Sequence, residues 1–243
     1  PQFLWLKDYL KQYSNEEIIN VDVKFTMPYP DNPGWRYNPQ MGGSTLLDIG
    51  TYNLSIILEL IENEIPDILF KEVKSVPSIP IDMNGHISLV YPSGTICNLF
   101  WGMGLPYRNE IDIVTTNGSI YSDKIFSKTE EYKPAFIIRD LNGNQKSIES
   151  INCNHFVRMF NYFFGLINNK HEAKKERDRI LSLSEWTEKI RDYWIFLEIL
   201  LAIASEDVKP GDSMPNKFTR PDMLWSEGNC ISKSDRWWSG SDL

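Results

Sequence analysis

One segment of this 243-residue chain, residues 35–52 (WRYNPQMGGSTLLDIGTY), concentrates side chains that suit acid–base chemistry. Asp48 and Tyr52 are four residues apart, so a helix places both on one face. Two glycines precede them at the expected helix start, where free N–H groups and the helix dipole favour negative charge. A phenol in that field is suited to giving a proton to a forming alkoxide, or to taking one from an alcohol. Arg36 adds a fixed positive charge with forked donors.

Each of these residues also has a purely structural interpretation. Thr45-x-x-Asp48 fits a capping box, with Asp in the place that Glu usually takes. Tyr52 fits a boundary tyrosine, with its ring in the core and its hydroxyl in water. Trp35 and Arg36 fit a cation–π or packing pair, and the two glycines fit a simple turn. The residues alone therefore leave capping and packing open beside catalysis.

Hydrophobic periodicity predicts the elements that position this segment. Residues 3–10 have helical spacing, residues 19–27 alternate as a half-buried strand, and a helix is expected at about 45–61. Asn117-Gly118 is a type I′ hairpin signal between two further strands. The strands expected after the helix are 68–76, 86–91, 95–101, 110–116, 119–122, 135–140 and 145–149.

The remaining chain predicts helices and then an irregular end. Residues 155–169 and 180–204 have helical periodicity, and the first of these helices has one apolar face. The whole pattern predicts an α+β fold: a large, mostly antiparallel sheet with helices on one face, and the other face available to a second copy. We expect residues 1–204 to form this domain and residues 205–243 to form an irregular C-terminal extension.

Composition limits the classes of function. The formal net charge of −8 argues against a sequence-independent grip on nucleic acid. No apolar stretch reaches the roughly 20 residues that a membrane span needs. The three cysteines are far apart and the three histidines are dispersed, so neither a disulfide framework nor a metal site is expected. We expect a cytoplasmic protein without a nucleic acid or membrane partner.

The segment at 35–52 resembles the signature of the Gfo/Idh/MocA family (glucose–fructose oxidoreductase and inositol dehydrogenase). Its members show Trp-Arg, a glycine run, and then Asp-x-Gly-x-His or Asp-x-Gly-x-Tyr. Three further pieces resemble the family in the same order: residues 1–26, ISLVYPSGTICNLFW at 87–101 and NEIDIVTTNGSIY at 109–121. The resemblance covers about residues 1–204 and leaves the end of the chain unmatched.

The resemblance implies the second, α+β domain of an NAD- or NADP-dependent oxidoreductase acting on a sugar, nucleotide sugar or cyclitol. An N-terminal Rossmann domain binds the dinucleotide in such proteins, and the α+β domain supplies substrate contacts and often an oligomer interface. By position, Tyr52 is the expected proton donor or acceptor, and Asp48 is expected to hydrogen-bond substrate hydroxyls. Trp35 and Arg36 are expected to line the cofactor and substrate cleft. The remaining expected substrate contacts are Asn38 and Gly43.

Two family features are absent from the sequence. No Gly-x-Gly-x-x-Gly occurs, and Lys133-Pro134 lies after Tyr52, whereas the family's Glu-Lys-Pro lysine precedes it. We therefore expect the chain to begin inside a longer protein and to be inactive without its dinucleotide domain. Two other functions stay open: a non-enzymatic dimerisation or ligand-binding module, and a carbohydrate-binding domain unrelated to redox chemistry.

Overall fold

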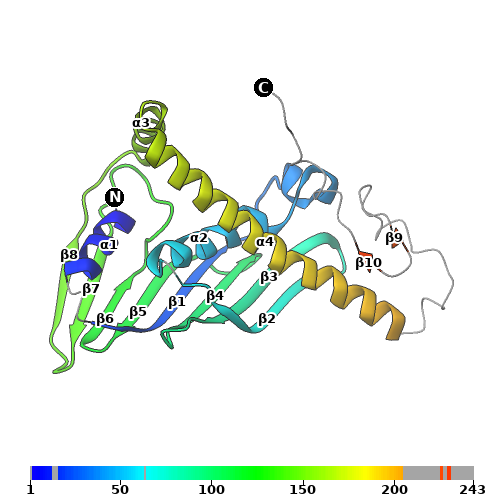
Figure 1. Cartoon of the computed structure of the whole chain (residues 1–243), viewed down its shortest axis with the longest axis horizontal. Coiled ribbons are helices and arrows are strands. Elements are labelled where there is room, and N and C mark those ends of the chain that lie inside the picture. The colour runs from blue at the N-terminus through cyan, green and yellow to red at the C-terminus, as the bar shows by residue number, and fades with distance from the viewer. Residues whose placement is uncertain (1, 13–15, 63, 205–224, 227–228, 231–243) are drawn as a thin grey trace. The chain divides into compact units, whose positions relative to one another are not determined.

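The structure is a computed structural model of the whole chain (Figure 1). It describes residues 2–12, 16–62, 64–204, 225–226 and 229–230, with side chains as far as residue 191. The chain divides into a unit of residues 1–190, which contains the sheet and the candidate site, and a unit of residues 191–243. Within the second unit, Trp225–Ser226 (β9) and Asn229–Cys230 (β10) pair as short antiparallel strands. The rest of the predicted C-terminal extension lies outside the described residues.

The first unit is built on an eight-stranded sheet, which confirms the predicted α+β class. Its spatial order is β2-β3-β4-β1-β5-β6-β7-β8. All pairs are antiparallel except β1 and β4, which run parallel. The strands are β1 (Ile18–Met27), β2 (Asp67–Val76), β3 (Ile79–Val90), β4 (Ile96–Met103), β5 (Arg108–Thr115), β6 (Gly118–Ser122), β7 (Ala135–Asp140) and β8 (Gln145–Glu149).

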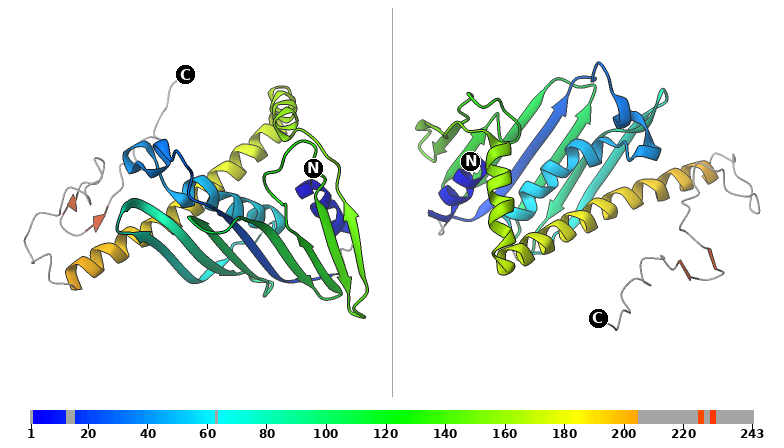
Figure 2. Two further views of the ribbon diagram at one scale, coloured as in Figure 1. Left: turned by 180° about the vertical axis from the view of Figure 1, so that it is seen from behind. Right: turned by 90° about the horizontal axis from the view of Figure 1, so that it is seen from above.

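Side-chain alternation explains the two faces of the sheet. In the central strand β1, Val21, Val23 and Phe25 are buried, whereas Asp22 and Lys24 between them point to the other face. Helices cover only the face of the buried residues (Figure 2). They are α1 (Gln2–Gln12), α2 (Thr51–Leu60) and the first part of α4 (Lys170–Ala204). The predicted arrangement, with helices on one face, is therefore confirmed.

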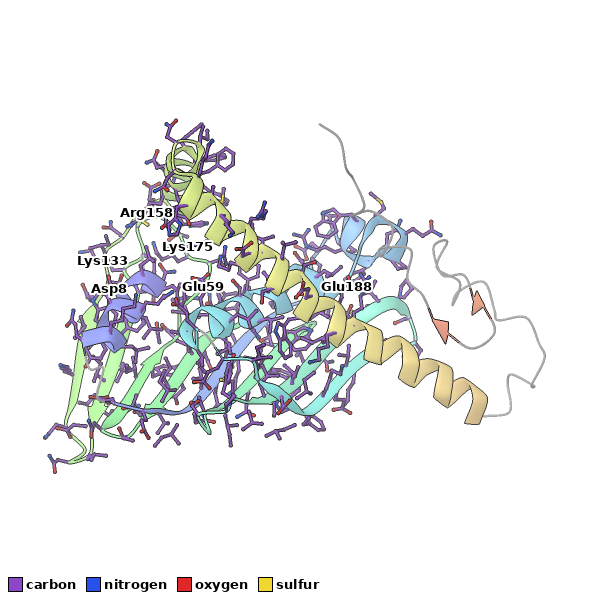
Figure 3. All side chains as sticks on the ribbon, in the orientation of Figure 1. Asp8, Glu59, Lys133, Arg158, Lys175 and Glu188 are labelled. Atoms are coloured by element: carbon purple, nitrogen blue, oxygen red, sulfur yellow. The ribbon has the colours of Figure 1, made fainter. Side chains whose placement is uncertain are left out.

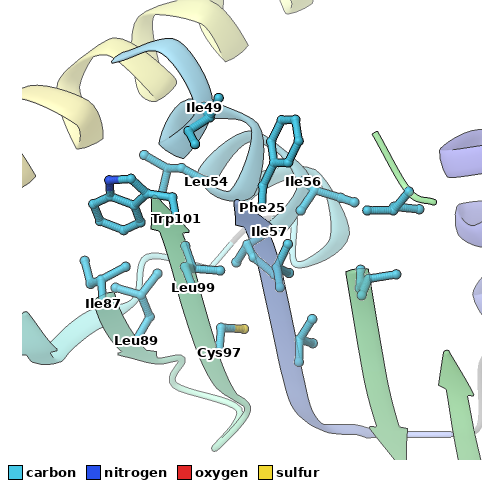
Figure 4. Close-up of a cluster of buried hydrophobic side chains, with 14 of the residues drawn as sticks. Phe25, Ile49, Leu54, Ile56, Ile57, Ile87, Leu89, Cys97, Leu99 and Trp101 are labelled. Carbon is cyan, nitrogen blue, oxygen red and sulfur yellow. The ribbon is translucent and has the colours of Figure 1, made fainter. Parts of the chain in front are cut away.

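The core lies between α2 and the middle of the sheet. Leu54, Ile56 and Ile57 of α2 lie in one buried apolar cluster with Cys97 and Leu99 of β4 (Figure 4). All five are at most 4% exposed. Burial of each leucine or isoleucine among them contributes roughly 1.5–3 kcal/mol of hydrophobic stabilisation. Asn53 fixes the same helix to the sheet, because its Nδ2 donates to the Phe100 carbonyl at 2.8 Å. This packing fixes α2 against the sheet and so supports the segment at its N-terminal end.

Two predicted strand boundaries are wrong. β3 begins at Ile79, seven residues before the predicted start at His86. In the β5–β6 hairpin, Thr115 pairs with Gly118. The two turn residues are therefore Thr116 and Asn117, rather than the predicted Asn117 and Gly118. A Cβ on Gly118 would meet the backbone carbonyl of Arg139, so this glycine is needed for close approach to β7.

Helix α3 (His155–Ile167) and the first part of α4 form the end of the first unit. Arg179 of α4 joins this pair to α2, donating to Glu59 Oε1 at 2.7 Å; Glu59 is labelled in Figure 3. No residue of α3 is buried, and its large apolar side chains other than Leu166 are 53–63% exposed. Its predicted apolar face therefore does not contribute to the core. Among the described residues, no helix is both long and apolar enough to cross a membrane.

Candidate functional site

The loop before α2 folds as two 3₁₀ turns, η1 (Gly34–Tyr37) and η2 (Pro39–Met41). Asn38 links them: its Oδ1 accepts from Gln40 N at 3.0 Å, and its carbonyl accepts from Gly43 N at 2.9 Å. Gly42 has a φ of +80°, which favours glycine. A Cβ on Gly43 would meet the backbone carbonyls of Trp35 and Arg36. The glycine pair is therefore required to fold this loop tightly.

The helical segment after the glycines begins as a π-helical turn, η3 (Leu46–Gly50), and continues as α2. Its first N–H groups are all occupied within the protein. Thr45 N and Leu46 N donate to the Asp82 carboxylate at 3.1 and 2.7 Å, and Leu47 N donates to Ser44 Oγ at 3.2 Å. The capping-box interpretation is wrong, because Thr45 makes no side-chain cap and Asp82 of β3 takes that place. The expectation of free N–H groups at this helix start is wrong for the same reason.

The other end of the π turn rests on Trp101 of β4. Gly50 lies so close that its Cβ would be 3.0 Å from the indole ring, and a Cβ on Gly85 of β3 would overlap the six-membered part of that ring. Trp101 is 1% exposed and lies against both glycines. Close packing of this kind leaves little room for the turn to shift. Single π turns inside helices occur frequently at functional sites.

Asp48 lies in the middle of the π turn and pairs with Arg36. Arg36 Nε is 2.8 Å from Asp48 Oδ2, and the two side chains are 36% and 18% exposed. The guanidinium also lies 4.8 Å from the centroid of the Trp35 ring, which is itself 43% exposed. Trp35, Arg36 and Asp48 therefore form one surface cluster of an aromatic ring, a cation and a carboxylate. Trp35 and Arg36 thus form the cation–π pair that the structural interpretation expects, and Arg36 also contacts Asp48, as the chemical interpretation expects.

Tyr52 follows in the first turn of α2 and is 50% exposed. Its ring makes edge contacts with Phe25 of β1, at a centroid distance of 5.5 Å, and with Phe126 at 5.7 Å. These two phenylalanines stack on each other at 5.0 Å. Asn109 holds Phe126 in turn, because Phe126 N donates to Asn109 Oδ1 at 2.7 Å. The phenol is therefore fixed at its ring and accessible from solvent.

The structure thus brings together some of the predicted site residues and not others. Trp35, Arg36 and Asp48 are in contact, and Tyr52 follows Asp48 on the same helical segment. Asn38 and Gly43 lie in the same loop, where the hydrogen bonds of Asn38 and the burial of Gly43 serve the loop fold. Direct roles of these residues towards a substrate stay predictions.

Three supporting residues were missed: Asp82, Phe25 and Phe126. Asp82 had a visible signal, since it is an acid between the apolar residues Ile81 and Met83, where a buried carboxylate needs partners. The two phenylalanines had none beyond their apolar character. No group of His, Cys, Asp and Glu in the described part of the chain is arranged to hold a metal ion.

A cavity of about 310 Å³ lies elsewhere, at the end of the sheet formed by β6, β7 and β8. Tyr9, Thr115, Arg139 and Lys146 are among its lining residues, and none of the predicted site residues is. Thr115, which lines the cavity, pairs with Ile18 at the start of β1. Phe25, the neighbour of Tyr52, lies near the other end of β1. The cavity and the candidate site are therefore separate.

Comparison with known proteins places this geometry in a family context. Residues 3–121 match the GFO/IDH/MocA C-terminal domain. A curated relative, the dTDP-3,4-didehydro-2,6-dideoxy-alpha-D-glucose 3-reductase of Streptomyces antibioticus, is 29% identical over 130 residues. The match covers 52% of this chain and 38% of the relative. The enzyme of the same name from Saccharopolyspora spinosa is 23% identical over 128 residues, again 38% of its length. The chain thus spans about two fifths of these relatives.

Solved structures share the fold. KijD10, a 3-ketoreductase from Actinomadura kijaniata in complex with NADP and TDP-benzene, aligns with a TM-score of 0.72 at 18% identity, covering 79% of this chain and 60% of KijD10. An inositol dehydrogenase homologue complexed with NAD⁺ from Azotobacter vinelandii aligns with a TM-score of 0.50 at 16% identity, covering 60% and 40%. The family match over residues 3–121, just under half of the chain, confirms the resemblance in the sequence for these residues: they match the C-terminal domain of the GFO/IDH/MocA family.

Proposed function

We propose that this chain is the substrate-side domain of an NAD- or NADP-dependent oxidoreductase that acts on a sugar, nucleotide sugar or cyclitol. The family match and the sugar 3-reductase relatives support the reaction class. One observation carries the proposal for this chain. A half-exposed phenol, Tyr52, is held by two aromatic rings one helical turn after an Arg36–Asp48 pair.

Tyr52 is the proposed proton donor or acceptor. A reduced dinucleotide, when bound, supplies the hydride that adds to the carbonyl carbon of a keto-sugar. Tyr52 gives its phenolic proton to the carbonyl oxygen, so that a secondary alcohol and a phenolate result; the reverse reaction takes the proton back. The phenolate is reprotonated from solvent, which reaches the half-exposed side chain. General acid–base catalysis of this kind contributes about 10²–10⁴-fold to a rate.

Arg36 and Asp48 are proposed to orient the substrate. Arg36 uses Nε for Asp48, so its two terminal nitrogens can donate to hydroxyl or phosphate oxygens. Asp48 uses Oδ2 for Arg36, so Oδ1 can accept from a sugar hydroxyl. Because each side chain holds the other, neither must be ordered when the substrate binds, which lowers the entropic cost of binding.

The dinucleotide is proposed to be bound mainly by a Rossmann domain outside residues 1–243. The sequence contains no Gly-x-Gly-x-x-Gly, and the N–H groups at the start of η3 are occupied by Asp82 and Ser44. An anion therefore has no free helix start here. Trp35 and Arg36 fit a contact with one edge of the cofactor, because they expose an aromatic ring beside a cation.

The uncovered face of the sheet is proposed to form a homo-oligomer. Phe70, Ile96 and Val114 lie on three different strands and are 47%, 40% and 38% exposed. Burying such side chains against a second copy is favourable. Sedimentation velocity of the full-length protein tests this proposal: a monomer at micromolar concentration contradicts it.

The experiment for the enzymatic proposal compares two tyrosines in the full-length protein. Oxidation of NADPH or NADH is followed with a panel of dTDP-linked and free keto-sugars. Tyr52→Phe is expected to lower kcat by about 10²–10⁴-fold, with the dinucleotide affinity unchanged. Tyr162→Phe is the control, because Tyr162 is similarly exposed, at 53%, but lies on α3 and contacts Glu176.

Three results contradict the proposal in different ways. Wild-type kcat in Tyr52→Phe removes Tyr52 from the proton step. An equal loss in folded Tyr52→Phe and Tyr162→Phe contradicts a specific role of the Tyr52 hydroxyl. Full-length protein that binds no dinucleotide favours the alternative of a non-enzymatic module with the same fold.

A further inference from the structure

Asp82 is a buried carboxylate that belongs to β3 but serves the helical segment of the candidate site. It is 8% exposed, and it lies 36 residues after Leu46, whose N–H donates to its Oδ2 at 2.7 Å. Its Oδ1 accepts from Thr45 N at 3.1 Å, and the Ser44 hydroxyl is a third partner. Both carboxylate oxygens are therefore directed at the first residues of one helix.

The charge of Asp82 is balanced by dipoles rather than by a cation. Among the described residues, no ion pair involves it, and its partners are backbone N–H groups and one hydroxyl. Burial raises the pKa of Asp82, and the hydrogen bonds from Ser44, Leu46 and Thr45 act in the opposite direction. A carboxylate in this position is also stabilised by the positive end of the helix dipole.

The contacts of Asp82 define where the π turn begins. Leu46 is the first residue of η3, and Asp48 is two residues further on. The end of the same turn is fixed by Gly50 against Trp101. The turn is therefore held at both ends, and the side chain that pairs with Arg36 lies between the two attachments. Tyr52 follows only two residues after the second attachment.

We propose that Asp82 is a positioning residue: it fixes the start of the π turn and thereby the placement of Asp48 and Tyr52 relative to the substrate. This inference rests on the proposed function. Asp82 itself contacts neither Tyr52 nor the Arg36–Asp48 pair among the interactions of the described residues, so it acts through the backbone. Displacement of a catalytic group by about 1 Å is enough to cost up to about 10²-fold in rate.

Asp82→Asn is the most informative variant. An amide has the same shape but only one acceptor oxygen, so its NH₂ faces one of the two backbone donors, Thr45 N or Leu46 N. One end of the turn is thereby released while the volume of the side chain is kept. We expect kcat of the full-length enzyme to fall about tenfold to a hundredfold, by the cost of misplacement. KM for the sugar rises as well, because Asp48 is placed by the same turn, whereas the dinucleotide affinity stays near the wild-type value.

Thr115→Val is the matched control, because it also removes a buried polar contact. Thr115 is 5% exposed, and its Oγ1 donates to Glu16 at 2.8 Å. It pairs with Ile18, seven residues along β1 from Phe25, or about 23 Å away at the usual rise per residue. We expect this variant to melt at a lower temperature but to keep kcat. All variants are assayed at a temperature where their melting curves show them folded.

The outcomes separate this inference from the proposed function. Wild-type turnover in folded Asp82→Asn overturns the positioning role and leaves the proposed function intact. Absence of turnover in the wild type with every substrate overturns the proposed function itself. If Asp82→Asn does not fold, Ser44→Ala replaces it, because Ser44 contacts Asp82 and accepts from Leu47 N. A kcat loss in Ser44→Ala supports the role, and wild-type kcat overturns it.

A double variant gives a second readout. If Asp82 acts through Tyr52, then Asp82→Asn costs less in the Tyr52→Phe background than alone, because the group that it positions is already gone. Equal losses in both backgrounds overturn this coupling.

Discussion

Two surfaces of this molecule expose aromatic side chains to a similar extent, yet they differ in how those side chains are held. Tyr52 is 50% exposed and Phe160 of α3 is 54% exposed. The Tyr52 ring rests on Phe25 and Phe126 from two other parts of the chain. Helix α3 has no buried residue. Exposure alone therefore does not identify a site; an exposed group with a fixed position does.

The largest expected contrast is between two glycine substitutions: one next to Trp101, which supports the candidate site, and one on α3. Gly85→Ala places a methyl group into the Trp101 ring, so we expect a loss of about 1–3 kcal/mol in the free energy of unfolding. Gly165→Ala on α3 meets nothing within 4 Å and favours the helix by about 0.5–1 kcal/mol. Urea unfolding of both variants measures the difference. A change of the same sign in both proteins would contradict the contrast.

A smaller effect is expected from the cation of the site. Arg36→Lys keeps the charge but loses the forked donors and Nε, which lies 2.8 Å from Asp48. We expect KM for the sugar substrate to rise about tenfold or more, because a hydrogen bond to a charged group contributes about 1.5–3 kcal/mol. Stability changes by less than about 1 kcal/mol, because the arginine is partly exposed.

The matched control for this substitution is Arg177→Lys on α4. Arg177 is 68% exposed and lies 3.8 Å from Asp178. Steady-state kinetics of both variants in the full-length protein is the measurement. An unchanged KM in Arg36→Lys would remove Arg36 from substrate binding.

The smallest expected effect is a pH dependence at the α3–α4 junction. The hydrogen bond from Arg179 lowers the pKa of Glu176 below its ordinary 4.5, against the effect of burial. The folded-state pKa lies below the unfolded one, so this contribution is complete above about pH 4.5 and is lost as pH falls through the folded-state pKa. We expect about 0.5 kcal/mol, because both side chains are partly exposed. Glu176→Gln is expected to flatten that part of the stability profile in urea unfolding at several pH values.

Most of the sheet could be predicted from the sequence because its signals are local. Alternation and flanking turn residues located β7 and β8 at their observed bounds, and β1 within one residue. β3 was predicted too short, because its first half contains Pro80, Asp82 and Gly85, which are typical of turns. Asp82 and Gly85 are there for their contacts with the helix start and Trp101, which are distant in the chain.

The site was predictable as a cluster but not as a geometry. Residues 35–52 supply Trp35, Arg36, Asp48 and Tyr52 in one segment, so their proximity follows from the sequence. The π turn leaves no periodic signal, because one inserted residue shifts the helix without changing its composition. Thr45-x-x-Asp48 fits a capping box in the sequence, whereas the true acceptor, Asp82, comes more than thirty residues later, beyond the reach of a local pattern.

The placement of β1 between β4 and β5 has a consequence for synthesis. The strand made first is bordered on both sides by strands that end at residues 103 and 115. The backbone N–H and C=O groups of β1 cannot all be paired within the sheet until the chain has been made as far as residue 115. The entropy of closing such long loops slows folding. β1 therefore gains its second neighbour only once β5 has been made, although it is the first strand of this sheet along the chain.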